Sequence, residues 1–587
     1  ICNNPAVPTD VIGQAASASA ADIDLALQTA TVWKATPVER GEILKRAADL
    51  FEKNDGELFA LLTREAGKTL PDAVSELRES VDFLRYYAGE INHAPALGLV
   101  SCISPWNFPL AIFTGQIAAA LAAGNAVLAK PAEQTPLIAY FATCLLHQAG
   151  VPRKALQLLP GDGTVGAALT SSARVDGVAF TGSTQTAKNI RVKMAETLTP
   201  GAPFIAETGG LNAMIVDSTA LPEQAVANII ESAFQSAGQR CSALRCVYVQ
   251  DDIAPEFIAM LIGAMRQLSL DDPWLLRSDL GPVIDPVAKA RISKHIAQAA
   301  DQNRVLWTQP VPLQGHYVAP TLIRVSGIEA LEQEVFGPVL HLATFASHQI
   351  NAVIEAINNT GYGLTFGLQT RLSNRTRDIA QRIMAGNIYV NRNQIGAVVG
   401  SQPFGGHGLS GTGPKAGGPF YLNRFHAVGQ QNISHSWDQI MSQTALTATM
   451  KTAATGLQSP DSFLPGPTGE LNARSTFAKP PILCAGPGKK AAETQAKAVT
   501  ALGGVAVKAT GQIRAEHLTD LTRLGAVIWW GDGPTARMFD LALAARAGPI
   551  VALITGQPDS AHVLFEQHVC IDTTAAGGNA ALLRGDS

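Results

Sequence analysis

The feature that most constrains the fold is a repeated alternation of short apolar runs and longer helical stretches from Leu97 onward. Runs of four or five apolar residues are typical of buried strands, and strands that alternate with helices pair in parallel. The pattern therefore predicts an α/β fold with a parallel, doubly wound sheet. The expected strands are Leu99–Ile103, Ala126–Ala129, Leu156–Leu159 and Gly177–Phe180, and the expected helices are Thr114–Ala123, Pro136–Gln148 and Thr164–Thr170.

Further blocks flank this region. From Asp22 to about Tyr87, Ala and Leu recur at three- and four-residue spacing, which predicts helices. A second alternating block starts after Glu207, with expected helices Ala225–Ala237 and Pro255–Leu268 around a strand at Cys246–Val249. A third begins at Pro481; its expected strands are Ile482–Ala485, Ala526–Trp530 and Ile550–Ile554, and its expected helix is Lys489–Leu502.

Composition excludes several classes of protein. The chain is 47% hydrophobic with a formal net charge of −4, so it can fill a core and carries no basic stripe for a nucleic acid. Seven cysteines at irregular spacing form neither a disulfide framework nor a zinc site, so we expect a reducing compartment and no metal. Leu110–Ala129 is interpreted as a buried helix followed by a strand. No signal peptide is expected, and Ile1 is interpreted as the edge of a fragment or of an ordered region.

Two glycine-rich turns need an interpretation. Gly161–Gly166 matches G-x-G-x-x-G after an apolar strand, but the acid expected about 20 residues on, Asp176, precedes a strand rather than ending one. We interpret this segment as a strand-to-helix turn. Gly486–Gly488, in the third block, leaves open a second nucleotide site as an alternative to a domain without chemistry.

Six other segments are more specific when taken together. In their order and spacing they resemble the NAD(P)-dependent aldehyde dehydrogenase superfamily, over residues 1 to about 426. The segments are SPWNFP at Ser104–Pro109, KPAE at Lys130–Glu133, FTGS at Phe180–Ser183, ETGG at Glu207–Gly210, GQRCS at Gly238–Ser242 and EVFGP at Glu334–Pro338.

This resemblance implies an aldehyde dehydrogenase-like fold and a division of the chain. We expect a Rossmann-type NAD-binding domain at 1–206 and an α/β catalytic domain at 207–395. Residues 396–460 are expected to hold a substrate anchor loop and an oligomerisation or linker segment. Residues 461–587 are expected to form a smaller C-terminal aldehyde-dehydrogenase-like domain without catalytic residues, which covers a channel or contributes an interface.

The chemistry of aldehyde oxidation fits three residues of these segments. A thiolate forms a covalent adduct and later leaves, so Cys241 is the expected nucleophile, with neighbouring Arg240 favouring the thiolate. By resemblance, Asn107 and the Cys241 backbone N–H receive the oxyanion. Hydrolysis of the resulting thioester needs a base, and Glu207 matches that position.

The resemblance also implies the cofactor site. Lys130 and Glu133 match the positions that hold the adenosine ribose, and since Glu133 would repel a 2′-phosphate, we expect NAD rather than NADP. Gly182 and Ser183 open a helix that suits the pyrophosphate. The remaining expected cofactor residues are Trp106, Gly210, Glu334 and Phe336.

Longer segments narrow the substrate. Arg78–Tyr87, Gln239–Arg245, Asn391–Gly406 and Gly408–Tyr421 resemble L-glutamate-γ-semialdehyde (1-pyrroline-5-carboxylate) dehydrogenases, above all the version in bifunctional proline-utilisation flavoproteins. Two tail segments resemble the C-terminal domain of the longer members of that family; they are Gly466–Leu471 and Thr573–Ala580.

The implied reaction is NAD-dependent oxidation of glutamate semialdehyde to glutamate, the second step of proline catabolism, without a metal. The short zwitterionic substrate suits backbone N–H groups that bind its carboxylate. By resemblance, Gly396 and Ala397 form this anchor, Ser242 adds a hydroxyl, and Phe108 and Phe404 pack against the aliphatic stem.

The resemblance further implies a homodimer or larger oligomer and a cytoplasmic location, with peripheral membrane association as an option for a full-length protein. That protein would carry an FAD-dependent proline dehydrogenase N-terminal to this chain, and no FAD site or nucleic-acid site is expected here. Two alternatives stay open. One is another semialdehyde or fatty-aldehyde dehydrogenase, and the other is a non-catalytic binding or structural protein on the same fold.

Overall fold

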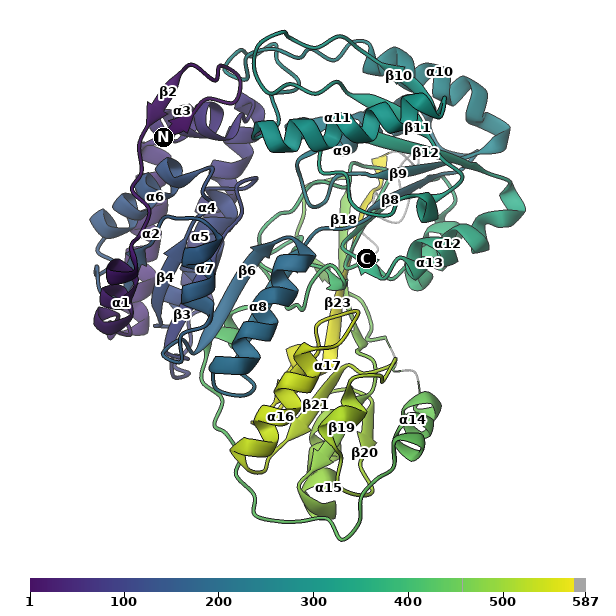
Figure 1. Cartoon of the computed structure of the whole chain (residues 1–587). Helices are drawn as coiled ribbons and strands as arrows, with labels where there is room; N and C mark the ends of the chain where they lie inside the picture. Colours follow the sequence, from purple (N-terminus) through teal and green to yellow (C-terminus); the bar gives the residue numbers. More distant parts are fainter. Residues whose placement is uncertain (455, 457, 575–587) are drawn as a thin grey trace.

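The computed structural model describes residues 1–574 except 455 and 457 (Figure 1). Within these residues the chain forms a five-stranded, a ten-stranded and a four-stranded sheet, together with two small two-stranded ribbons. The ribbons pair β1 (Cys2–Asn3) with β2 (Val11–Gly13), and β13 (Tyr362–Gly363) with β16 (His407–Gly408).

The five-stranded sheet is parallel and has the order β5-β4-β3-β6-β7. The first two strands in the chain, β3 and β4, are buried throughout, because they are mostly apolar and are covered on both faces. The expected parallel α/β sheet is confirmed. The elements are β3 (Leu99–Ile103), α5 (Ala111–Ala122), β4 (Ala126–Lys130), α6 (Pro136–Ala149), β5 (Leu156–Leu158), α7 (Gly163–Thr170), β6 (Gly177–Gly182), α8 (Thr184–Thr197) and β7 (Phe204–Thr208).

Four helices precede this sheet, as the 3.6-residue spacing predicted. Two of them, α1 and α2, begin with capping boxes in which Ser19 and Thr36 exchange hydrogen bonds with Asp22 and Glu39. The long fourth helix packs against α2 and α5. The bounds are α1 (Ala20–Thr29), α2 (Pro37–Lys53), α3 (Asp55–Ala66) and α4 (Leu70–Gly89).

The ten-stranded sheet has the order β10-β11-β12-β9-β8-β14-β15-β23-β18-β17. Its central strands run parallel from β11 to β23, and the strands at both ends are antiparallel. Its strands from the middle of the chain are β8 (Ala213–Val216), β9 (Cys246–Gln250), β10 (Val305–Thr308), β11 (Thr321–Arg324), β12 (Val339–Phe345), β14 (Thr365–Gln369) and β15 (Asn387–Val390). The helices of this part are α9 (Pro222–Phe234), α10 (Ala254–Met265), α11 (Pro286–Asp301), α12 (Ile350–Asn359) and α13 (Ser373–Arg382).

The four-stranded sheet is parallel, with the order β20-β19-β21-β22, and lies below α8 in Figure 1. Its helix α16 packs on α8, where Arg191 and Asp540 form a buried ion pair. The elements are α14 (Gln443–Thr452), β19 (Ile482–Gly486), α15 (Gly488–Ala501), β20 (Ala506–Lys508), β21 (Ala526–Trp529), α16 (Gly533–Ala544), β22 (Ala552–Ile554) and α17 (Ser560–Val563).

Three C-terminal strands do not belong to this small sheet. They are β17 (Ser462–Leu464), β18 (Glu470–Ala478) and β23 (Leu564–Asp572), and they extend the ten-stranded sheet beyond β15. Strand β23 pairs in parallel with β15, with Asn387 opposite His568. The C-terminal part of the chain therefore completes the sheet that is built from residues 213–390. Of the tail segment Thr573–Ala580, all residues from 575 onward lie outside the described residues.

Neither glycine-rich turn is an open phosphate site. Asp162 caps α7 by accepting from the Thr164 N–H, and Asp176 accepts from the Leu99 N–H at 2.8 Å, so both acids serve the local fold. At the other turn, the Gln495 side chain bonds the N–H and carbonyl of Gly486, and Trp437 lies against that glycine. The turn at Gly486–Gly488 is thus occupied by the chain itself, which disfavours a second nucleotide site.

Among the described residues, no helix has the length and apolarity that a bilayer span requires. The same residues contain no group of three or more His, Cys, Asp or Glu side chains arranged to hold a metal ion.

A chain that ends at residue 460 tests the role of the C-terminal strands. Removal of β23 exposes the edge of β15, where Tyr389 is fully buried in the intact protein. We expect a lower melting temperature and aggregation, measured by circular dichroism and size-exclusion chromatography beside the intact chain. An unchanged melting temperature with a single sharp elution peak would contradict this expectation.

Candidate active site

The structure brings Cys241, Glu207 and Asn107 together from three separate segments. Asn107 follows β3, Glu207 lies in β7, and Cys241 lies between the short helix η1 (Gln235–Gly238) and β9. The Asn107 Nδ2 donates to the carbonyl of Gln239 at 3.1 Å. The carboxyl of Glu207 is close enough to Cys241 to raise the pKa of its thiol.

The backbone before Cys241 has an unusual conformation. Ser236, Ala237 and Gly238 have φ values of 54°, 53° and 66° in succession. In Ser236 and Ala237 the left-handed conformation costs free energy, because a Cβ disfavours it. Such a backbone persists only where the surrounding structure enforces it. A Cβ on Gly238 would lie 2.2 Å from the Gly337 carbonyl oxygen, so only glycine fits there.

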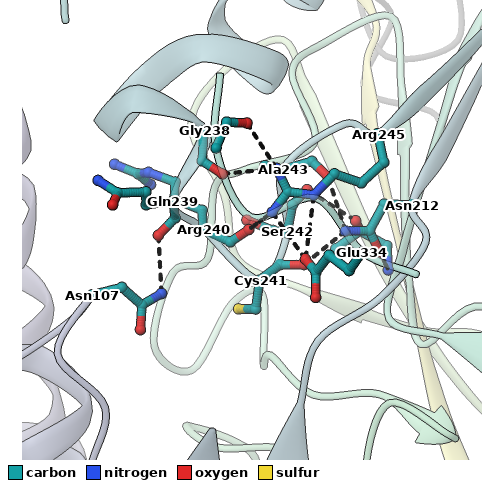
Figure 2. A network of polar contacts seen from close by, with 12 residues as sticks. Asn107, Asn212, Gly238, Gln239, Arg240, Cys241, Ser242, Ala243, Arg245 and Glu334 are labelled. Carbon is teal, nitrogen blue, oxygen red and sulfur yellow. Dashed lines mark hydrogen bonds and ion pairs between the residues drawn. The ribbon is translucent and has the colours of Figure 1, made fainter. Parts of the chain in front are cut away.

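A buried guanidinium fixes this loop. Arg245, which is 1% exposed, donates to the carbonyls of Gly238 at 2.7 Å and Arg240 at 2.9 Å. It also forms an ion pair in which two of its nitrogens bond Glu334 Oε1, at 2.9 and 3.2 Å, and it donates to the Gly337 carbonyl at 3.4 Å. Figure 2 shows Arg245 at the centre of these contacts, with the Cys241 sulfur pointing away from them.

The carbonyls on the other side of the nucleophile are held as well. Asn212 Nδ2 donates to the carbonyls of Cys241 at 2.7 Å and Ala243 at 3.0 Å. The Thr365 hydroxyl donates to the Ser242 carbonyl at 3.1 Å. Within the described residues, the Cys241 N–H itself has no acceptor. That N–H and the second hydrogen of the Asn107 amide are therefore available to an oxyanion.

The Cys241 thiol is neutral in the ligand-free site. Burial, and after it the nearby carboxyls of Glu334, Glu207 and Glu79, raise the pKa of the thiol to about 12, and Arg240 opposes this with the smallest effect of the five. The expectation that Arg240 favours the thiolate is right in direction, but burial outweighs it. Arg240 is turned toward Asp72, which it contacts at 2.8 Å.

Glu207 is held by a glycine loop. Its Oε2 accepts from the Gly406 N–H at 3.1 Å, whereas its buried Oε1 has no hydrogen-bond partner in the described structure. Burial raises the pKa of this carboxyl to about 8, and the Gly406 bond and the Lys415 ammonium work in the opposite direction. A carboxyl with this pKa is suited to exchange protons near neutral pH.

The residues expected at the cofactor fall into two groups. At the end of β4, the Lys130 Nζ lies 3.5 Å from Glu133 Oε2, and burial lowers the pKa of the lysine. On the far side of β3, which separates β4 from β6 in the sheet, Gly182 ends β6 and the Ser183 hydroxyl caps α8 by accepting from the Thr186 N–H. The first turn of α8 contains no acidic residue, as an anion-binding helix start requires.

The second group lies at the nucleophile. Trp106 and Phe336 meet edge to face with ring centroids 5.6 Å apart. Glu334 reaches over Gly209, where a Cβ would lie 2.0 Å from Oε2, and accepts a bond from the Gly210 backbone. Burial raises the pKa of Glu334, although Arg245 opposes this.

Of the expected substrate residues, Ser242 follows Cys241 directly, and the loop of Gly396 and Ala397 is linked to it through Gln394. Gln394 donates to the Ser242 carbonyl at 3.4 Å, which places the loop of Gly396 and Ala397 beside the nucleophile. Tyr389 OH donates to the Gly396 carbonyl at 2.6 Å, and within the described residues the N–H groups of Gly396 and Ala397 have no acceptor. Phe404 pairs with Ala416 in the glycine-rich tract.

Phe108 has a more polar setting than an apolar stem requires. The Lys68 ammonium lies 4.2 Å from the centre of its ring, and the Arg240 guanidinium 5.3 Å. Lys68 also pairs with Glu76 at 3.0 Å, and Glu76 bonds the N–H groups of Leu110 and Ala111 at the start of α5. Cations over an aromatic face stabilise it electrostatically.

Sequence reasoning missed several residues of this site. They contact the nucleophile loop, the general base or Phe108, most of them from a distant part of the chain; they are Lys68, Asp72, Asn212, Arg245, Thr365 and Lys415. Arg245 and Lys415 lie within Gln239–Arg245 and Gly408–Tyr421, two segments that carried the resemblance, so their positions were the available signal.

Comparison with known proteins identifies the family. Residues 2–430 match the aldehyde dehydrogenase family, and the chain belongs to it. The bifunctional protein PutA of Salmonella typhimurium is 44% identical over 654 aligned positions, which cover 99% of this chain and 50% of that protein. The chain thus spans about half the length of such relatives. The 1-pyrroline-5-carboxylate dehydrogenase of Geobacillus kaustophilus is 35% identical over 451 positions, covering 71% of this chain and 87% of that one.

Solved structures agree. A crystal structure of bifunctional proline utilization A (PutA) has a TM-score of 0.69 at 48% identity and covers 70% of this chain and 45% of that one. The 1-pyrroline-5-carboxylate dehydrogenase from Thermus with bound NAD has a TM-score of 0.68 at 32% identity, covering 73% and 88%. The aldehyde dehydrogenase-like fold expected from the motifs is confirmed.

Replacement of Gly238 by alanine tests the loop geometry. The added Cβ must displace Gly337 or the turn that carries Cys241. Since a misplacement of about 1 Å at a reacting atom costs about 100-fold, we expect kcat/KM for aldehyde oxidation to fall by about that factor. Gly263→Ala is the matched control, because a Cβ there meets nothing within 4 Å. Equal activity of the two variants would contradict the constraint.

Proposed function

We propose that this chain is an NAD-dependent dehydrogenase that oxidises L-glutamate-γ-semialdehyde, the open form of 1-pyrroline-5-carboxylate, to L-glutamate. The observation that carries the proposal is the convergence of Cys241, Glu207 and Asn107 beside a loop with free N–H groups. Relatives named 1-pyrroline-5-carboxylate dehydrogenase, and others named PutA, support the choice of substrate.

The proposed reaction starts with attack of the Cys241 sulfur on the aldehyde carbon. The oxyanion is received by the Asn107 amide and the Cys241 N–H; donors of this kind are worth roughly 3–4 kcal/mol each. NAD, when bound, accepts the hydride. The resulting thioester on Cys241 is hydrolysed by a water that Glu207 deprotonates, and the thiol leaves.

The residues present fit a dinucleotide. Lys130 and Glu133 are placed to bond ribose hydroxyls, and Gly182 and Ser183 open the acid-free start of α8 to the pyrophosphate. Glu334 reaches over Gly209 toward the second ribose, held in place by Arg245. Trp106, Gly210 and Phe336 complete the nicotinamide side of the proposed site.

The proposed substrate carboxylate binds the N–H groups of Gly396 and Ala397 and the Ser242 hydroxyl. None of these three donors has an acceptor among the described residues, so they are available to a ligand. Phe108 and Phe404 flank the aliphatic stem in this proposal.

The proposal extends to partners. Because relatives of twice the length are named bifunctional, we include an FAD-dependent proline dehydrogenase unit that supplies the substrate, N-terminal in the same polypeptide. We also propose a homodimer or larger oligomer and a cytoplasmic location, with peripheral membrane association of the full-length protein.

NADH formation tests the reaction. We expect strong turnover of DL-1-pyrroline-5-carboxylate with NAD, weak turnover of propanal, which lacks the carboxylate, and none of either with Cys241→Ala. The absorbance of NADH measures all three. Turnover of propanal without turnover of pyrroline-5-carboxylate would keep the chemistry and reject the substrate. No turnover of either would favour a non-catalytic protein on this fold.

Ser242→Ala tests the anchor. A hydrogen bond to a charged group contributes about 1.5 kcal/mol or more, so we expect KM for pyrroline-5-carboxylate to rise about tenfold with kcat nearly unchanged. Propanal serves as the matched control substrate, and its KM should not change. If KM is the same for both enzymes with pyrroline-5-carboxylate, Ser242 is not part of the anchor.

A further inference from the structure

A buried lysine lies behind the proposed general base and has no part in the mechanism above. Lys415 is 3% exposed and lies in the glycine-rich tract after β16. Its ammonium donates to the carbonyls of Gly386 at 2.5 Å and Pro403 at 3.3 Å, and to Asn387 Oδ1 at 3.0 Å. None of these acceptors carries a charge, so none of them neutralises the ammonium. Its positive charge therefore acts on ionisable groups nearby.

Glu207 is one of these groups, and a single glycine, Gly405, separates it from Lys415. A Cβ on Gly405 would lie 2.9 Å from Glu207 Oε1 and 3.1 Å from the Lys415 Cα, so Gly405 is a spacer between the two residues. Asn387 Oδ1, which accepts from the ammonium, also accepts from the Gly405 N–H at 3.4 Å. The next N–H, that of Gly406, is the one that holds Glu207.

The other side of Lys415 is held by the C-terminal strand. Glu566 on β23 accepts from the Lys415 backbone N–H at 3.2 Å, and its second oxygen lies 3.4 Å from Arg474 on β18. Burial lowers the pKa of Lys415 to about 7, and both carboxyls, Glu566 and Glu207, oppose this by favouring its charged form. The lysine thus lies between two carboxyl groups, one in β7 and one in β23, that each stabilise its positive charge.

We propose that Lys415 is a positioning residue for the Glu207 carboxylate, and that Glu566 of the C-terminal strand fixes Lys415 in that place. This inference rests on the proposed function, in which Glu207 activates the water that hydrolyses the thioester. Lys415 favours the ionised form of Glu207, against the larger effect of burial, and holds its loop in register through Asn387 and Gly405. The C-terminal strand therefore acts on the active site without contributing a catalytic residue.

Several charged and titratable groups face this pair. Lys415 lowers the pKa of Glu207, whereas Glu566 raises it. Cys241 and Tyr421 are the other titratable groups near Glu207, and the groups near Lys415 are Arg474, His407 and His568. Burial lowers the pKa of both histidines to about 4 or 3, so they are neutral near pH 7. Lys415 and Glu566 are thus expected to shift the ionisation of Glu207 in opposite directions.

Infrared titration of the carboxyl band tests this without substrate or cofactor. The band is assigned to Glu207 by its loss in Glu207→Gln. We expect its midpoint to rise by about one pH unit in Lys415→Met, where an opposite charge is lost, and to fall in Glu566→Gln, where a like charge is lost. Lys479→Met is the matched control: it removes another buried ammonium, one that bonds the Ala561 carbonyl and lies over Phe565.

The same variants are then assayed for aldehyde oxidation. In Lys415→Met we expect kcat to fall about tenfold with KM nearly unchanged, and the acidic limb of the kcat profile to move to higher pH, because Glu207 ionises later. Glu566→Gln moves the limb to lower pH, and Lys479→Met leaves it in place. Disruption of packing alone would not move the two limbs in opposite directions.

Each outcome is decisive. Equal Glu207 midpoints in the wild-type chain, Lys415→Met and Glu566→Gln would overturn the proposal, as would shifts in the same direction. If Lys415→Met does not fold, the shift of the Glu207 midpoint in Glu566→Gln still tests the proposal. Lack of NADH formation by the wild-type chain would count against the proposed function alone, because the infrared titration does not depend on turnover.

Discussion

The active site depends on the burial of one guanidinium. Arg245 is enclosed by protein and would be costly there without partners. Its partners are the carbonyls of the turn that carries Cys241 and the carboxylate of Glu334. The charge thus joins the nucleophile loop to the loop expected at the nicotinamide ribose. Catalysis requires that the Cys241 sulfur is positioned within a fraction of an ångström. Several charge-assisted hydrogen bonds to the Arg245 guanidinium hold the loop that carries it.

A second constraint comes from the C-terminal end of the chain. Strand β23 follows the small four-stranded sheet in the chain but pairs with β15 of the ten-stranded sheet. As a result Glu566 lies behind the loop of Gly405 and Gly406. The C-terminal part is thus integral to the catalytic sheet. At its own glycine turn, the Gln495 side chain bonds the Gly486 backbone and Trp437 lies against that glycine, so side chains of the protein occupy this turn.

The sequence predicted those parts of the structure that are encoded locally. The strand and helix pattern of residues 97–180 was visible because its strands are short, mostly apolar runs separated by helical stretches. Cys241, Glu207 and Asn107 were visible because each sits in a short segment that resembles a known family. Asp72 and Asn212 were not, since each contacts a residue at least 29 positions away and neither lies in one of those segments. Lys415 lies in such a segment, but only its contacts with Gly386 and Asn387 in the folded chain reveal its role. The pairing of β23 with β15 was hidden for the same reason.

Burial also overturns the expectation that a neighbouring arginine makes the nucleophile a thiolate. Arg240 beside Cys241 suggested a thiolate, but a buried thiol with a pKa of about 12 next to a carboxyl with a pKa of about 8 keeps its proton. These values differ by about 12 − 8 = 4 pH units, so proton transfer from Cys241 to Glu207 costs roughly 5 kcal/mol in the ligand-free protein. A positive charge that arrives beside the sulfur reduces that cost, and an oxidised nicotinamide carries one. Burial therefore keeps the Cys241 thiol protonated in the ligand-free site.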